Sequence, residues 1–151
     1  MDSKVREVYF MGYLRRKTDV FLQGWKKNKD RYPLIIKGAR QVGKTETIRK
    51  FARENYKNVI EINFITEPSY KMIIDEGFSA DSITKLISRI DPSKHFVEGE
   101  TLIFFDEIQD FPEIATALKF FKENGKYDII CSGSLLGVQY HRIASISVGY
   151  K

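Results

Sequence analysis

Apolar and polar residues along this chain are spaced as in alternating strands and helices. Short runs rich in apolar and β-branched residues predict strands, and these runs lie at 34–36, 59–64, 102–105 and 128–131. Apolar residues at helical spacing predict helices between the strands, and these helices span 44–55, 81–90 and 112–124. This alternation predicts an α/β fold of three layers, in which helices cover both faces of a parallel sheet.

The first thirty residues are expected to form a helical segment. Four apolar residues fall near one face when they are placed at 3.6 residues per turn: Leu14, Phe21, Leu22 and Trp25. The polar stretch 28–31 then interrupts this pattern, and Pro33 precedes the first predicted strand. We therefore expect an N-terminal helical segment over 1–30 and a core over 31–151.

Composition excludes several classes of protein. The chain has 151 residues, of which 42% are hydrophobic and 30% charged, as in a globular domain rather than a disordered one. Its single cysteine, Cys131, excludes an internal disulfide framework, and with only two histidines it leaves no zinc cluster. We expect a reducing, cytoplasmic setting. No membrane span is expected, because no apolar run approaches the roughly 20 residues that one requires.

The net charge of +5 comes largely from two basic clusters, at 15–17 and 26–31. Runs of this kind are typical of a solvated helix face followed by a polar loop. A nucleic-acid surface is the alternative, but it would normally show a longer and stronger basic stripe. Nucleic acid is therefore kept only as a weakly supported partner.

The segment from Gly38 to Thr45 carries the most specific motif. It reads GARQVGKT and matches G-x-x-x-x-G-K-[ST], the phosphate-binding loop or Walker A motif, between a predicted strand and a predicted helix. Glycines allow a tight turn whose backbone N–H groups face the phosphates, and the N-terminus of the following helix adds to this anion site. Lys44 supplies a positive charge for the β- and γ-phosphates, and the Thr45 hydroxyl is a ligand for Mg²⁺.

Two carboxylates, Asp106 and Glu107, follow the most apolar of the predicted strands. The carboxyl ends of parallel strands form the ligand crevice of an open α/β sheet. Asp106 is therefore expected to hold magnesium together with Thr45, as in a Walker B motif. Glu107 is expected to activate the attacking water as the general base, so we predict Glu107 and Lys44 as catalytic residues.

Ser132 and Ser134 follow the last predicted strand and should reach the same edge of the sheet. A hydroxyl there is expected to contact the γ-phosphate or the attacking water, and Ser132 is preferred because it follows the strand directly. An ordinary turn is the alternative. Gln109 either helps to arrange the site or shapes the loop. The predicted ATP-binding residues are Gly38, Ala39, Arg40, Gln41, Val42, Gly43, Lys44, Thr45, Glu46, Ser132 and Ser134.

These motifs together resemble a family of prokaryotic AAA-type P-loop ATPases whose longer members carry a nuclease-like C-terminal domain of unknown function. The resemblance runs from about Arg31 to Gly137, and it rests on GARQVGKT, NVIEINF, TLIFFDEIQ and ALKFFKENGKYDIICSGSLLG. It implies the strand order 5-1-4-3-2, in which strand 1 precedes the phosphate loop. It assigns the same roles to Lys44, Thr45, Asp106 and Glu107, and the sensor position to the region of Ser132 and Ser134.

The resemblance also sets expectations for the end of the chain and for partners. Residues 146–151 are expected to enter the fifth strand, which leaves the core incomplete at its C-terminus. The expected partners are further copies of the chain or a C-terminal domain. An arginine from a neighbouring subunit greatly accelerates hydrolysis in such proteins, so slow turnover is expected for this chain alone.

Two other functions remain open at this point. One is a module that senses ATP, turns it over negligibly and perhaps acts on nucleic acid. The other is a kinase that passes phosphate to a small acceptor. A carboxylate at Glu107, next to the magnesium aspartate, favours water activation, and no basic lid typical of a kinase is recognised. An ATPase that uses Mg-ATP is therefore the leading interpretation.

Overall fold

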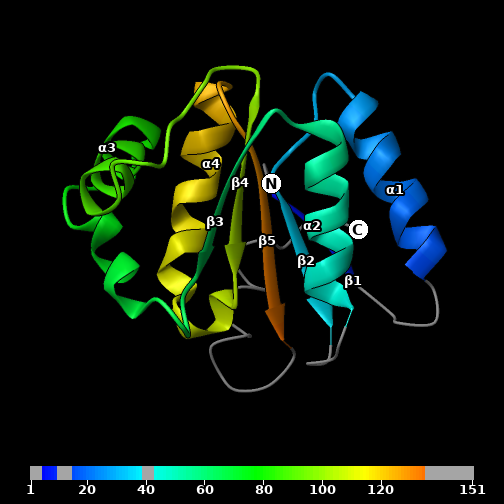
Figure 1. Cartoon of the computed structure of the whole chain (residues 1–151), viewed down its shortest axis with the longest axis horizontal. Helices are drawn as coiled ribbons and strands as arrows, with labels where there is room; N and C mark the ends of the chain where they lie inside the picture. The colour runs from blue at the N-terminus through cyan, green and yellow to red at the C-terminus, as the bar shows by residue number, and fades with distance from the viewer. Residues whose placement is uncertain (1–4, 10–14, 39–42, 135–151) are drawn as a thin grey trace.

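The computed structural model describes residues 5–9, 15–38 and 43–134, and in this part of the chain a parallel sheet lies between helices (Figure 1). The strands are β1 (Arg6–Tyr9), β2 (Leu34–Gly38), β3 (Asn58–Asn63), β4 (Thr101–Asp106) and β5 (Asp128–Ser134). The helices are α1 (Arg15–Lys27), α2 (Lys44–Asn55), α3 (Ala80–Ile90) and α4 (Ala115–Asn124). Short 3₁₀ segments are η2 (Pro68–Ile74), η3 (Ile108–Asp110) and η4 (Pro112–Ile114). The predicted α/β class is confirmed.

The strand order in this sheet is β1-β2-β5-β4-β3, and each pair of neighbours is parallel. The order β2-β5-β4-β3 agrees with the one implied by the resemblance. β5 therefore lies between the strand that precedes the phosphate loop and the strand that ends in Asp106. This insertion brings the ends of three strands together at one edge.

The outer neighbour of β2 corrects an expectation. Residues 6–9 were expected to be helical, but they form β1 and pair with β2 from Arg6↔Leu34 to Tyr9↔Lys37. They occupy the position expected for a fifth strand from 146–151, which lies outside the described residues. Val5, before β1, is buried, and Glu7 on β1 contacts the fully buried Lys37. Burial lowers the pKa of Lys37 to about 8.

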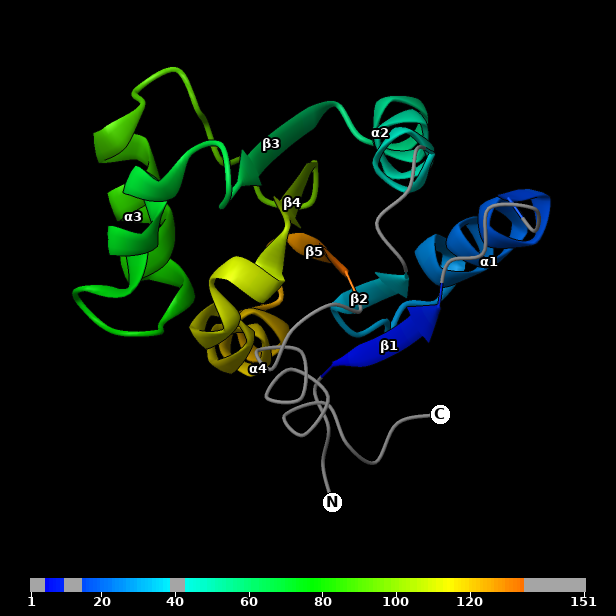
Figure 2. The same ribbon diagram turned by 90° about the horizontal axis from the view of Figure 1, so that it is seen from below.

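Two pairs of helices cover the two faces of the sheet (Figure 2). On one face, α1 and α2 pack through Leu22, Trp25, Ile48, Phe51 and Ala52 against Leu34, Ile36, Leu102, Phe104 and Ile130. On the other face, α3 and α4 pack against the alternate residues of the same strands, among them Ile35, Ile62, Ile103, Phe105 and Cys131. Side chains of a strand alternate between its two faces, so the polar residues that continue the first set face α2.

The elements begin and end where local chemistry allows. The Ser79 hydroxyl accepts a hydrogen bond from the Ser82 N–H and caps α3. Gly125, with φ 72°, ends α4 in the left-handed region that glycine adopts readily. The α-helix expected to begin at Pro112 begins at Ala115 instead, because η4 precedes it. The last strand continues to Ser134, three residues beyond the predicted end.

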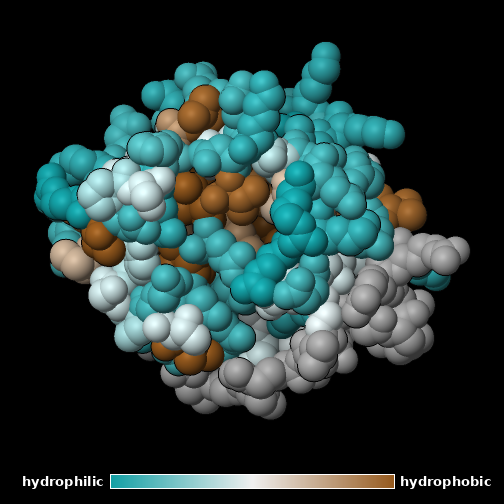
Figure 3. Space-filling model, in the orientation of Figure 1, coloured by the Kyte–Doolittle hydropathy of each residue, from teal (hydrophilic) through white to brown (hydrophobic). Residues whose placement is uncertain are grey.

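The surface of one face shows how far the helices cover the sheet. In Figure 3, apolar side chains gather in a hollow near the middle of this view, within a mostly hydrophilic surround. Val59 on β3 is only partly buried and packs against the core of the α1–α2 face. Among the described residues, no helix has the length and the apolar character needed to cross a membrane.

Candidate functional site

Three strands of the sheet end close together. Gly38 at the end of β2 pairs with Ser134 at the end of β5, and Phe105 on β4 pairs with Cys131 on β5. Because the strands are parallel, the carboxyl ends of β2, β5 and β4 form one edge, as the sequence predicts. Helix α2 begins at this edge with Lys44.

Lys44 points across the end of β5. It is 6% exposed, and its Nζ donates a hydrogen bond of 2.8 Å to the Gly133 carbonyl. Gly43, just before it, has φ 115°, a conformation that glycine adopts and other residues rarely do. Ala39, Arg40, Gln41 and Val42, which were predicted to bind phosphate through their backbone, lie outside the described residues.

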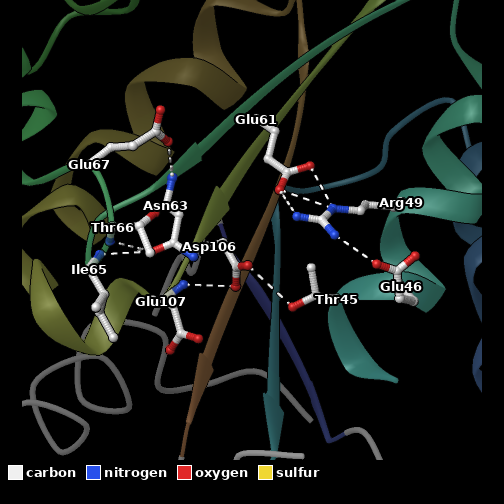
Figure 4. Close-up of polar contacts among 10 residues, drawn as sticks. All are labelled: Thr45, Glu46, Arg49, Glu61, Asn63, Ile65, Thr66, Glu67, Asp106 and Glu107. Atoms are coloured by element: carbon white, nitrogen blue, oxygen red, sulfur yellow. Dashed lines mark hydrogen bonds and ion pairs between the residues drawn. The ribbon is translucent and has the colours of Figure 1, made fainter. Parts of the chain in front are cut away.

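Thr45 and Asp106 meet directly, although 61 positions separate them. The Thr45 hydroxyl donates to Asp106 Oδ2 at 3.2 Å, and the Glu107 N–H donates to Asp106 Oδ1 at 2.9 Å (Figure 4). Asp106 follows Leu102 and Phe104 in the strand alternation, so its side chain lies on the face that α2 covers. The two residues predicted to share a magnesium ion are therefore brought together.

The carboxylate of Asp106 is energetically costly in this position. It is 2% exposed, and burial raises its pKa, as does the nearby charge of Glu107. The Ser132 and Thr45 hydroxyls and the Glu107 N–H lower the pKa but do not cancel the increase. Because the charged form is disfavoured here, a cation at this carboxylate would stabilise it.

Glu107 has a backbone conformation that the sequence does not reveal. Its φ of 60° places it in the left-handed region, and it is the one described non-glycine residue with positive φ. Such conformations cost energy and cluster at functional sites. The Gln109 Nε2 donates to Glu107 Oε1 at 2.7 Å, and the Ser134 N–H donates to Gln109 Oε1 at 3.0 Å. Gln109 thus contacts both the carboxylate and the end of β5.

Ser132 and Ser134 lie inside β5 rather than after it. Both are buried, with exposed fractions of 1% and 2%. Ser132 follows Cys131, the partner of Phe105, so its hydroxyl lies beside the Asp106 carboxylate, whose pKa it lowers. Ser134 contributes its backbone N–H to Gln109. Contact of either hydroxyl with a nucleotide stays a prediction.

An ion-pair network next to this site was missed in the sequence. Arg49 on α2 binds Glu61 on β3 through two nitrogens, with Nη2 at 2.6 Å, and binds Glu46 through Nη1 at 2.7 Å. Figure 4 shows Glu46 directed toward Arg49 and away from Asp106. The predicted role of Glu46 in nucleotide binding stays a prediction. The Glu46–Arg49 spacing of three is a helix signal, but Glu61 comes from another element.

The basic cluster at 26–31 lies at the opposite edge of the sheet, where the strands begin. Arg31 precedes β2 and forms an ion pair of 2.8 Å with Asp128, the first residue of β5. The Tyr56 hydroxyl donates to the same carboxylate at 2.6 Å. Part of the positive charge that suggested nucleic acid is therefore neutralised within the fold.

Comparison with known proteins places this geometry in a family. A family model described as an AAA domain matches residues 30–151, which is most of the chain. A solved structure, "Structure of C. elegans PCH-2", matches with a TM-score of 0.56 and 10% identity, over 94% of this chain and 42% of that one. This chain thus spans less than half of that structure, and the likeness shows a shared fold. Curated proteins give no match. The chain belongs to the AAA family of P-loop nucleotide-binding domains.

Proposed function

We propose that the chain binds Mg-ATP at the edge formed by β2, β5 and β4 and hydrolyses it. The observation that carries this proposal is the hydrogen bond from Thr45, in the first turn of α2, to the buried Asp106 at the end of β4. A hydroxyl and a carboxylate meet there beside the lysine of a phosphate-binding motif. This combination supports a magnesium polyphosphate rather than an uncharged ligand.

The phosphates would lie at the start of α2. The first N–H groups of a helix have no partner within the helix, and its dipole favours negative charge. The Lys44 ammonium adds a full positive charge at the same place, next to Gly133. Gly43 leaves room for the backbone to approach the ligand. In this account, Gly38 and the loop 39–42 surround the phosphates through their backbone N–H groups.

The residues present fit a magnesium ion. Thr45 and Asp106 offer hard oxygen atoms, and the raised pKa of Asp106 reflects a carboxylate that lacks compensating positive charge. The described residues contain no group of three His, Cys, Asp or Glu side chains able to hold a metal. Magnesium suits such a small set, because it keeps several water ligands in nucleotide sites. When bound, it would neutralise charge on the β- and γ-phosphates.

Glu107 is placed to act as the general base. Its carboxylate follows Asp106 directly and is half-buried, and Gln109 holds one of its oxygens. In this role the carboxylate accepts a proton from the water whose oxygen attacks the γ-phosphorus, while the bond to the leaving ADP oxygen breaks. Lys44 neutralises the charge that develops on the transferred phosphoryl group. The Ser132 region would orient the γ-phosphate or the water.

The wider setting follows from family membership only as a proposal. We place the boundary between the N-terminal segment and the ATPase core near residue 30, and we infer that nucleotide turnover drives a change in another copy or another domain. The buried, single Cys131 suits a reducing, cytoplasmic compartment. A nucleic-acid partner is not proposed, because Arg31 is already paired with Asp128.

Replacing Asp106 with asparagine tests the magnesium assignment. The pKa of Asp106 is higher in the folded chain than in the unfolded chain, so ionisation of this carboxylate opposes folding at neutral pH. Asp106→Asn is therefore expected to stabilise the nucleotide-free protein by about 0.5–2 kcal/mol at pH 7. The gain should disappear as the pH falls toward about 3.9, the pKa of an unfolded aspartate. Urea unfolding at several pH values measures this difference.

The same variant separates metal binding from nucleotide binding. In the parent, Mg²⁺ is expected to strengthen the binding of a fluorescent ATP analogue, and in Asp106→Asn this strengthening should be lost. Asp110→Asn is the matched control, because Asp110 is exposed and pairs with Lys71. An Asp106→Asn protein that keeps the full effect of Mg²⁺ would show that the metal binds elsewhere.

A further inference from the structure

A chain of hydrogen bonds crosses the end of β5 between Lys44 and Glu107. Lys44 Nζ donates to the Gly133 carbonyl at 2.8 Å. The Ser134 N–H belongs to the same peptide unit as that carbonyl, and it donates to Gln109 Oε1 at 3.0 Å. The Gln109 Nε2 then donates to Glu107 Oε1 at 2.7 Å. One peptide of β5 and one amide side chain therefore connect the lysine of α2 to the carboxylate after β4.

The chemistry of the partners fixes the direction of each hydrogen bond. A backbone N–H only donates and a carboxylate only accepts, so the Gln109 oxygen must face Ser134 and its nitrogen must face Glu107. The carbonyl and N–H of one trans peptide point to opposite sides of a strand. The Gly133 carbonyl accordingly faces the side of β2 and α2, and the Ser134 N–H faces the side of β4. All of these bonds run in one sense from Lys44 to Glu107.

The surroundings make this connection strong enough to matter. Lys44, Ser134 and Gln109 are all at least nine-tenths buried, and hydrogen bonds in a low-dielectric interior are stronger and polarise one another. Glu107 has its left-handed backbone at the far end of the connection. A strained residue keeps its conformation only when its surroundings hold it, and Gln109 provides one such contact.

We propose that Gln109 is a positioning residue that sets the orientation of the Glu107 carboxylate and makes it depend on Lys44 through the 133–134 peptide. When Lys44 turns from the Gly133 carbonyl toward a phosphate, the peptide loses a donor, and the bond from Ser134 to Gln109 weakens. The Gln109 amide then holds Glu107 less tightly, so the carboxylate is free to turn toward water. This inference rests on the proposed role of Glu107 as the base.

Two substitutions of Gln109 test the positioning role. Gln109→Glu keeps an oxygen acceptor for the Ser134 N–H but removes the donor to Glu107, whereas Gln109→Met removes both contacts at similar size. Both variants are expected to bind the ATP analogue as the parent does. Their single-turnover hydrolysis should fall by about 10–100-fold, the usual effect of losing a partner that orients a reactive group.

A double-mutant cycle distinguishes positioning from a general structural effect. If Gln109 acts through Glu107, then adding Gln109→Glu to Glu107→Gln should lower the residual rate no further. An equal additional loss in that background would overturn the proposal while leaving the role of Glu107 intact. Failure of the parent to bind nucleotide would instead contradict the proposed function itself.

The dependence on Lys44 is tested without nucleotide or turnover, by the NMR signals of the Gln109 side-chain amide and the Ser134 N–H. Lys44→Ala removes the first donor, so both signals are expected to shift in the nucleotide-free protein. Thr47→Val is the matched control, because Thr47 lies on the same helix, is buried, and has a hydroxyl without a hydrogen-bond partner in the described part of the chain. Signals that stay in place in Lys44→Ala, or that move equally in Thr47→Val, would overturn the inference.

Discussion

ATP turnover is expected to fall by about 10²–10⁴-fold when Glu107 is replaced with glutamine, while nucleotide binding is retained. Glutamine has the size of glutamate and keeps an Oε1 that can accept the hydrogen bond from Gln109. The backbone at this position and the contact with β5 should therefore persist. Only the ability to take a proton from water is lost, so the effect should appear in the chemical step.

Phosphate release and ATP-analogue titration on the same samples separate these two quantities. Glu113→Gln is the matched control, since Glu113 is exposed on η4, close in sequence to the site. It should keep the parent rate. If Glu107→Gln hydrolyses ATP as fast as Glu113→Gln does, Glu107 is a structural residue and the base lies elsewhere.

Replacing Phe105 with alanine is expected to lower the free energy of unfolding by about 3–5 kcal/mol. Phe105 is completely buried on the central strand β4, and its ring stacks on Phe64 with centroids 5.6 Å apart. Its removal leaves a cavity in the core of the α3–α4 face that these aromatic rings cannot fill. Because Asp106 is the next residue, the position of the site depends on the same packing.

Urea unfolding followed by the fluorescence of Trp25 measures this loss. Trp25 is buried on the opposite face of the sheet, so its signal reports unfolding of the whole domain rather than the local cavity. Val20→Ala is the control. Val20 is 68% exposed, and its truncation should change stability by no more than about 0.5 kcal/mol. Comparable losses in the two variants would contradict the assignment of Phe105 to the core.

Several features of the fold were predictable because their signals are local. The run at 102–105 is apolar throughout, as a strand buried on both faces must be, and it forms β4 in the middle of the sheet. The glycine and lysine of the motif mark the start of α2, which begins at Lys44 as expected. From these two positions, the meeting of Thr45 and Asp106 follows from parallel topology.

Other features depend on contacts that the sequence does not express. β1 has four residues, too few to show a period, and its place is set by pairing with β2. The end of β5 was placed too early because Ser-Gly-Ser is typical of turns, whereas here it pairs with the end of β2. The role of Gln109 depends on the backbone of Ser134, 25 positions away. The left-handed backbone of Glu107 has no residue signature at all.

The central claim, that the phosphate-binding motif binds ATP, is tested most directly by titrating a fluorescent ATP analogue into the parent and Lys44→Ala in the presence of Mg²⁺. Lys44→Ala is expected to weaken binding at least tenfold, or about 1.4 kcal/mol, because the charge at the start of α2 is removed. Lys50→Ala on the same helix, exposed and paired with Glu54, should bind as the parent does. Equal affinity in the parent and Lys44→Ala would contradict the assignment of this edge of the sheet as the nucleotide site.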